Sequence, residues 1–156
     1  MKEKVVLFIG DTIVCAEPFK EFIELEGDYR CLYNTSIKEA KHNIYIEHSV
    51  YKDIPRENRP DLVIIDVYPS KMENAIFNGK EINSFDFAAW IKKYHPNILV
   101  LLMVMGRPKN GQTNLHSLDH LDFQELKQKN IADHICYLPL KALDLLKEID
   151  TVFKKN

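Results

Sequence analysis

The sequence lacks the features that mark secreted and membrane-spanning chains. Its longest apolar run, Ile98–Met105, is eight residues long, whereas a helix needs roughly 20 apolar residues to cross a bilayer. The first residues, MKEKVVLFIGD, place Asp11 directly after a short apolar stretch, which is too short for a secretory signal. We therefore expect a cytoplasmic protein that does not enter a membrane.

The chain also lacks an excess of charge of one sign. It carries 21 basic and 23 acidic residues, for a formal net charge of −2. Proteins that bind nucleic acid or anionic lipid surfaces by electrostatics usually present a basic excess. The balance therefore predicts neither nucleic acid nor a membrane surface as a partner.

Cysteine is scarce, and its spacing is uninformative for metal binding. The three cysteines, Cys15, Cys31 and Cys136, are odd in number and far apart, and they form no CxxC or zinc-ligand pattern. We interpret them as reduced thiols, which is typical of a cytosolic protein.

What is present is an ordinary globular composition. The chain has 156 residues, 46% of them hydrophobic and 28% charged. A chain of this length can bury a core without disulfides or metals, and we expect one domain spanning residues 1–156.

Short apolar runs alternate with segments of helical periodicity. The expected strands are 4–9, 29–33, 62–66, 98–104 and 132–138, and the expected helices are 17–26, 36–43, 85–94, 121–129 and 140–153, with Pro18 in the first turn of the first helix. Strands that alternate with helices pair in parallel through right-handed crossovers. The sequence predicts an α/β fold: a three-layer, doubly wound sheet of five parallel strands, flavodoxin-like, in the order 2-1-3-4-5.

Two acidic residues follow strands that would be central in such a sheet. Asp11 comes just after the first strand, and Asp66 ends the third. The first and third strands are neighbours at the topological switch point, where ligands bind. Two carboxylates there can hold Mg²⁺, and either can be a nucleophile toward phosphoryl groups. The alternative is that both are turn residues at strand ends.

Three segments together carry a resemblance to a known family. RPDLVIIDVYP (59–69), HPNILVLLMVMG (95–106) and IADHICYLPLKALDLLKEI (131–149) resemble the third, fourth and fifth strands of receiver domains in two-component response regulators. The resemblance implies that Asp66 is the phosphoacceptor, that Asp11 is a metal ligand, and that Tyr68 offers a backbone carbonyl to the metal.

The sequence departs from that family at three pocket positions. Gly10 stands where receivers have the first of two acids, Val104 or Met105 where they have a hydroxyl, and Leu138 where they have a lysine before the proline. These groups bind the metal, read the phosphoryl group and neutralise it. We therefore expect Mg²⁺ to bind weakly and an acyl phosphate on Asp66 to be poorly stabilised.

Two functional hypotheses follow from the resemblance, and neither is enzymatic. In the first, Asp66 accepts a phosphoryl group from a histidine kinase. In the second, which the altered pocket favours, a stand-alone receiver-like domain acts through constitutive protein–protein interaction. The partner is a histidine kinase or a downstream signalling protein, and a homodimer is compatible with the sequence.

An alternative resemblance concerns the end of the first strand. FIGDT (8–12) resembles the GDS block of SGNH-type hydrolases, with Thr12 at the nucleophile position. The later blocks of that family are absent, and a threonine without a positioned base is a poor nucleophile. This alternative describes a degenerate hydrolase-like α/β domain.

The connections 44–58 and 106–120 are long for a compact domain. Long connections of this kind are usually functional. Their roles stay open at this point.

Overall fold

The structure, a computed structural model, describes residues 3–10, 13–34, 37, 40, 59–67, 75–77, 80–82, 84–105, 130–138 and 140–156. In chain order the elements are β1 (Lys4–Ile9), α1 (Ile13–Glu26), β2 (Tyr29–Asn34), β3 (Leu62–Val67), β4 (Ala75–Phe77), β5 (Lys80–Ile82), α3 (Ser84–Tyr94), β6 (Leu99–Met105), β7 (His134–Leu138) and α5 (Ala142–Lys155).

The main sheet has five strands in the order β2-β1-β3-β6-β7. Every neighbouring pair in it is parallel, so the carboxyl ends of the strands share one edge. Counted along the chain, this is the order 2-1-3-4-5. The predicted doubly wound, flavodoxin-like sheet is confirmed.

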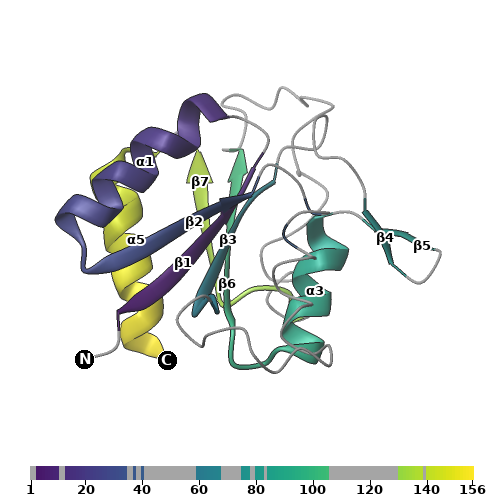
Figure 1. Cartoon of the computed structure of the whole chain (residues 1–156). Coiled ribbons are helices and arrows are strands. Elements are labelled where there is room, and N and C mark those ends of the chain that lie inside the picture. The colour runs from purple at the N-terminus through teal and green to yellow at the C-terminus, as the bar shows by residue number, and fades with distance from the viewer. Residues whose placement is uncertain are drawn as a thin grey trace, which may run out of the picture.

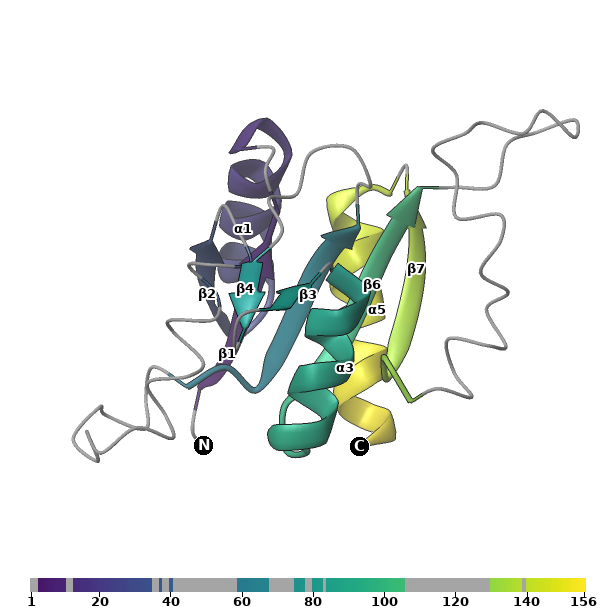
Figure 2. The same ribbon diagram turned by 90° about the vertical axis from the view of Figure 1, so that its right-hand side faces the viewer.

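Helices cover both faces of the sheet. In Figures 1 and 2, α1 and α5 lie against one face and α3 against the other. Residues on β3 alternate between two buried clusters: Leu62 and Ile64 pack with α1 and α5, whereas Val63 and Ile65 pack with α3. A fully buried Leu, Ile or Val side chain stabilises the fold by about 1.5–3 kcal/mol, so this alternation fixes the face of every residue on the strand.

The first helix begins earlier than its periodicity suggested. Because α1 starts at Ile13, Pro18 lies inside the helix, and its predicted place in the first turn is wrong. A proline there removes one backbone N–H from the helix. Burial of the helix face outweighs that loss, since most helical stability in proteins comes from tertiary packing: Ile23 of α1 is fully buried in the sheet core.

A small hairpin was not predicted. Strands β4 and β5 pair antiparallel as a separate two-stranded sheet that lies beyond α3, away from the main sheet (Figure 1). The sequence signal was Asn78-Gly79 between the two strands, a pair typical of tight hairpin turns.

Two predicted helices fall mostly or wholly outside the described residues. Of the helix expected at 36–43, Ile37 and Ala40 are described; both are helical and buried. The helix expected at 121–129 lies outside the described residues, as do the connections 44–58 and 106–120.

The amino edge of the sheet carries two similar polar brackets, each built on an aspartate. Asp61 accepts a hydrogen bond from the Val5 amide through Oδ2 at 2.8 Å and donates its own amide to the Val5 carbonyl at 2.8 Å. Asp133 does the same with Val100, at 2.7 and 2.8 Å. Each bracket ties the start of one strand to its neighbour, which opposes a slip of register.

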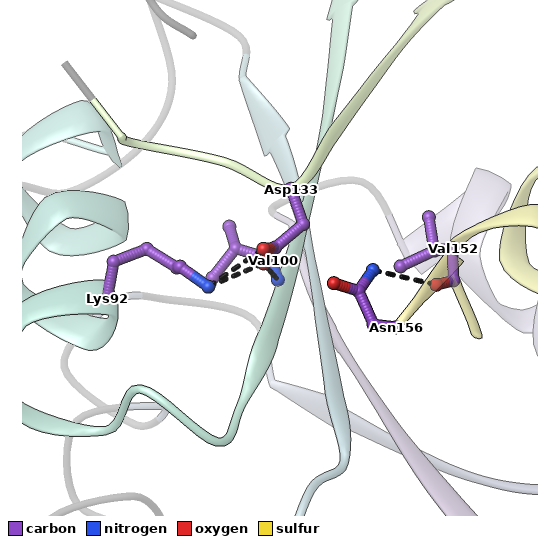
Figure 3. Close-up of polar contacts among 5 residues, drawn as sticks. All are labelled: Lys92, Val100, Asp133, Val152 and Asn156. Atoms are coloured by element: carbon purple, nitrogen blue, oxygen red, sulfur yellow. Dashed lines mark hydrogen bonds and ion pairs between the residues drawn. The ribbon is translucent and has the colours of Figure 1, made fainter. Parts of the chain in front are cut away.

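The second bracket includes a cation. Nζ of Lys92, on α3, lies 2.8 Å from both carboxylate oxygens of Asp133, and Figure 3 shows it reaching from the helix to the strand start. Both side chains are largely buried, at 10% and 15% exposure. The pair therefore fixes α3 to the sheet.

The carboxyl end of α5 is held at the same edge. The Tyr29 hydroxyl donates to Asp150 at 2.6 Å, and the Tyr29 ring stacks on Phe153. The Lys4 ammonium lies 4.0 Å from the centre of the Phe153 ring. The Asn156 side chain donates to the Val152 carbonyl (Figure 3). The last turns of α5 are thus fixed to β1 and β2.

Candidate functional site at the carboxyl edge

Asp66 is the carboxylate at the carboxyl end of β3. It pairs in register with Met103 of β6 and shares the face of Leu62 and Ile64, by the alternation of the strand. The residue is half-buried, and its Oδ1 atom is buried. The sequence had placed Asp66 at a strand end; the structure places it on the face covered by α1 and α5.

Gly10 lies directly against Asp66. It is buried at the end of β1, and a Cβ added to it would stand 3.2 Å from the Asp66 Cβ and 3.6 Å from Oδ2. That approach is tight, so the missing side chain at position 10 is part of how the two strands pack. The position where receivers carry an acid is here a close backbone contact with Asp66.

The end of β2 holds Gly10 from the other side. The Gly10 amide donates to the Asn34 carbonyl at 3.1 Å, and the Tyr33 hydroxyl donates to the Gly10 carbonyl at 2.7 Å. Sequence reasoning missed this role of Tyr33. The signal available was a polar-tipped aromatic residue at the end of a predicted edge strand.

Two neighbouring residues of β6 lie on different faces. Met103 belongs to the buried cluster beneath α1 and α5, the face of Asp66. Val104 belongs to the cluster beneath α3, so its side chain packs on the opposite face from Asp66. Met105 pairs in register with Leu138 at the end of β7.

Cys136 of β7 lies in the same register row, next to Met103. Burial, together with the negative charges of Glu148 and Asp66, raises the pKa of the Cys136 thiol to about 12. This thiol is therefore protonated at neutral pH, and protonated thiols are poor nucleophiles. Glu148, on α5, also pairs with the ring Nε2 of His134, which fixes α5 to β7.

Several predicted site residues lie outside the described residues. They are Asp11, Thr12 and Tyr68, and the side chain of Leu138 is likewise not described. Lys141, two residues after Pro139, is exposed just before α5. The described residues thus bring Asp66, Gly10, Tyr33 and Met103 together.

The donor set of the described residues does not by itself fit Mg²⁺. That ion prefers octahedral oxygen ligands, commonly one or two carboxylates with waters. Asp66 supplies one carboxylate here, with a glycine and a methionine beside it. Among the residues that the structure describes, no group of three or more His, Cys, Asp or Glu side chains could hold a metal ion.

Two further findings concern the described part of the chain as a whole. No helix in it is both long enough and apolar enough to cross a bilayer. Cys31 and Cys136 are free and buried.

No protein-family model matches the chain, and no curated protein matches it in sequence. The fold, however, is similar to solved structures. One is a response regulator receiver domain protein from Clostridium thermocellum, with 21% identity, a TM-score of 0.63, and coverage of 97% of this chain and 95% of that one.

Two more similar structures come from other bacteria. The receiver domain of NtrX from Brucella abortus has 15% identity and a TM-score of 0.64, with 97% of this chain and 99% of that chain covered. An orphan response regulator of H. pylori has 16% identity and a TM-score of 0.61, with 97% of each chain covered. At this identity the likeness shows the fold: the chain has the fold of a receiver domain.

Proposed function

From a receiver fold with an altered carboxyl edge, we propose that this domain is a receiver-like signalling domain that acts by binding a protein partner. The observation that carries the proposal is the contact between Gly10 and Asp66. A carboxylate stands at the end of β3, while the neighbouring position holds a glycine whose added Cβ would lie only 3.2 Å from the Asp66 Cβ.

The surroundings of Asp66 favour binding over phosphoryl transfer. Phosphorylation would add charge of about −1.5 to −2 at neutral pH. Met103 lies beside Asp66 and has an apolar side chain. The Cys136 thiol is near enough for the charge of Asp66 to raise its pKa. Mg²⁺ bound through Asp11 and the Tyr68 carbonyl would neutralise this added charge, and we expect that binding to be weak because Gly10 stands in place of the second acid.

A partner surface is available near the start of α5. Tyr137 of β7 is 38% exposed and Leu143 of α5 is 52% exposed, and both lie toward the carboxyl edge. Large apolar side chains exposed in this way are favoured at protein–protein contacts. The partner class is a histidine kinase or a downstream signalling protein.

One experiment tests the phosphorylation branch. The protein is incubated with Mg²⁺ and acetyl phosphate, or with beryllofluoride as an analogue of the phosphoryl group, and followed by intact mass and amide chemical shifts. The expected result is no adduct and at most small shifts at millimolar Mg²⁺. A stoichiometric adduct that is absent in Asp66→Asn would establish Asp66 as a phosphoacceptor and reverse our order of preference.

A second experiment tests the binding function. A photo-crosslinking residue replaces Tyr137 or Leu143 in the protein expressed in its native host cell. The matched control places it at Tyr94 of α3, which is 51% exposed on the other face. The expected result is a discrete crosslinked protein at positions 137 and 143 whose mass identifies a signalling protein. Crosslinking that is equal at all three positions, or absent from all, would contradict the proposal.

A further inference from the structure

Gly10, directly after β1, is hydrogen-bonded to β2 through both its amide and its carbonyl. The Gly10 amide donates to Asn34 and the Gly10 carbonyl accepts from the Tyr33 hydroxyl, at 3.1 and 2.7 Å. Glycine has more backbone freedom than any other residue. The Tyr33 hydroxyl therefore restrains the Gly10 carbonyl, which the backbone freedom of glycine would otherwise allow to rotate.

The same glycine lies next to Asp66. A Cβ added at Gly10 would stand 3.2 Å from the Asp66 Cβ, so little room separates the two residues, and closely packed interiors transmit small displacements. A chain of contacts thus runs from Tyr33 through Gly10 to Asp66. It crosses from the edge strand β2 to the central strand β3.

Both ends of this chain lie on one face of the sheet. Tyr33 packs against the buried cluster beneath α1 and α5, and Asp66 shares that face with Ile64. In the other direction, toward β7, the neighbours of Asp66 are Met103 and then Cys136. Met103 offers no hydroxyl to read a change at Asp66, whereas Tyr33 bonds directly to the backbone that touches it.

We propose that Tyr33 is a positioning residue that holds the end of β1 against Asp66 and carries changes of charge at Asp66 to the edge strand β2. This goes beyond the proposed function, in which Asp66 needs no change of charge for a partner to bind. It adds the route by which β2 responds and the residue that provides it.

The test is a set of paired substitutions read by amide chemical shifts of the full chain. Asp66→Asn removes the charge while keeping the shape, and it is made in the wild-type, Tyr33→Phe and Tyr29→Phe backgrounds. Tyr29 is the matched control, because it lies on the same strand and loses a hydroxyl bond of similar length, 2.6 Å to Asp150, at the opposite edge of the sheet.

In the wild-type background, Asp66→Asn is expected to displace the amide resonances of Gly10, Tyr33 and Asn34. In Tyr33→Phe the displacement at Tyr33 and Asn34 falls by about half or more, which is the signature of coupled sites. In Tyr29→Phe it is unchanged. If the Tyr33 hydroxyl were merely structural, Tyr33→Phe and Tyr29→Phe would both lower stability. The displacements that Asp66→Asn causes in β2 would then be the same in the two variants.

Three results would overturn the proposal: no displacement in β2 on Asp66→Asn, the same displacement in Tyr33→Phe as in wild type, or an equal reduction in both tyrosine variants. If Tyr33→Phe does not fold, Gly10→Ala takes its place, because Gly10 lies between Tyr33 and Asp66. Gly10→Ala is expected to shift the ring resonances of Tyr33, and unmoved resonances count against the proposal. No phosphoryl donor or partner is used, so failure of the proposed function leaves these shifts in place.

Discussion

The two edges of the sheet are built differently. At the amino edge, Asp61 and Asp133 each tie a strand start to its neighbour with a pair of hydrogen bonds, and Lys92 adds a buried ion pair. At the carboxyl edge, Asp66 stands among Gly10 and Met103. The carboxylates of Asp61 and Asp133 join strands at the amino edge, whereas Asp66 at the carboxyl edge lies beside a glycine and a methionine.

This difference separates stability from function. Open α/β sheets bind ligands at the carboxyl ends of their strands. Polar side chains at the amino edge can therefore serve the fold alone. An aspartate at the amino edge should therefore matter more for folding than Asp66 does. Substitutions at matched positions on the two edges test that expectation.

The largest effect is expected for Asp133→Ala. The substitution leaves Lys92, which is 10% exposed, without its carboxylate, and leaves the Val100 amide without its acceptor. Breaking one side of a buried pair costs about 3 kcal/mol or more. Urea denaturation should show this loss in the free energy of unfolding with little change in the slope against urea.

The control at the other edge is Asp66→Asn. We expect it to change the free energy of unfolding by less than about 1 kcal/mol, as for most substitutions that leave packing intact. Equal losses for Asp133→Ala and Asp66→Asn would remove the contrast between the edges.

A smaller contrast is expected between two glycines. A Cβ added at Gly27, which precedes β2 at the amino edge, would lie 2.7 Å from the Tyr29 ring, 2.8 Å from Leu146 and 2.9 Å from the Ile23 carbonyl oxygen. Because one of these atoms is backbone, the helix end itself must shift, and overpacking of this kind costs about 1–3 kcal/mol. Gly27→Ala should therefore lower the thermal midpoint.

Gly10→Ala is the matched substitution at the carboxyl edge. Its methyl group would meet the Asp66 Cβ at 3.2 Å, a contact that a shift of a few tenths of an ångström relieves. We expect a cost below that of Gly27→Ala, measured by the same thermal melts. The reverse order would mean that the carboxyl edge is the more rigid one.

Sequence reasoning reached the sheet order and the position of Asp66, because both depend on local patterns. Continuous apolar runs identify buried parallel strands. Strands that alternate with helices are joined by right-handed crossovers, which limits the possible strand orders. Asp66 follows such a run directly, so its place at the carboxyl edge could be predicted. The same reasoning could not choose the face of Val104, because a shift of one residue in register exchanges the two faces.

The contacts that join distant strands were not predictable in this way. An aspartate before a strand, such as Asp61 or Asp133, has the sequence signature of a turn, and its bracket appears once the strands are paired. The bond between Tyr33 and Gly10 joins residues 23 positions apart. The hairpin of β4 and β5 is different: its turn pair was visible in the sequence and was not used.

The smallest effect concerns two buried thiols near opposite sides of the sheet. Burial and the nearby charge of Glu24 raise the pKa of Cys31 on β2 to about 12. Burial and the charges of Glu148 and Asp66 raise the pKa of Cys136 on β7 to about 12. Above about pH 9 the unfolded thiols lose their protons while the folded ones keep them, so the free energy of unfolding should fall as pH rises from about 9 to 12 and be unaffected below.

For Cys136 the loss is on the order of 1 kcal/mol at pH 10, measurable by urea denaturation at pH 8, 9 and 10. Cys31→Ala and Cys136→Ala should each flatten this dependence. Asp66→Asn should leave the dependence unchanged up to pH 10, because the pKa of the folded Cys136 thiol, about 12, lies well above that range. A full dependence that persists in either alanine variant would mean that the substituted thiol does not contribute to it.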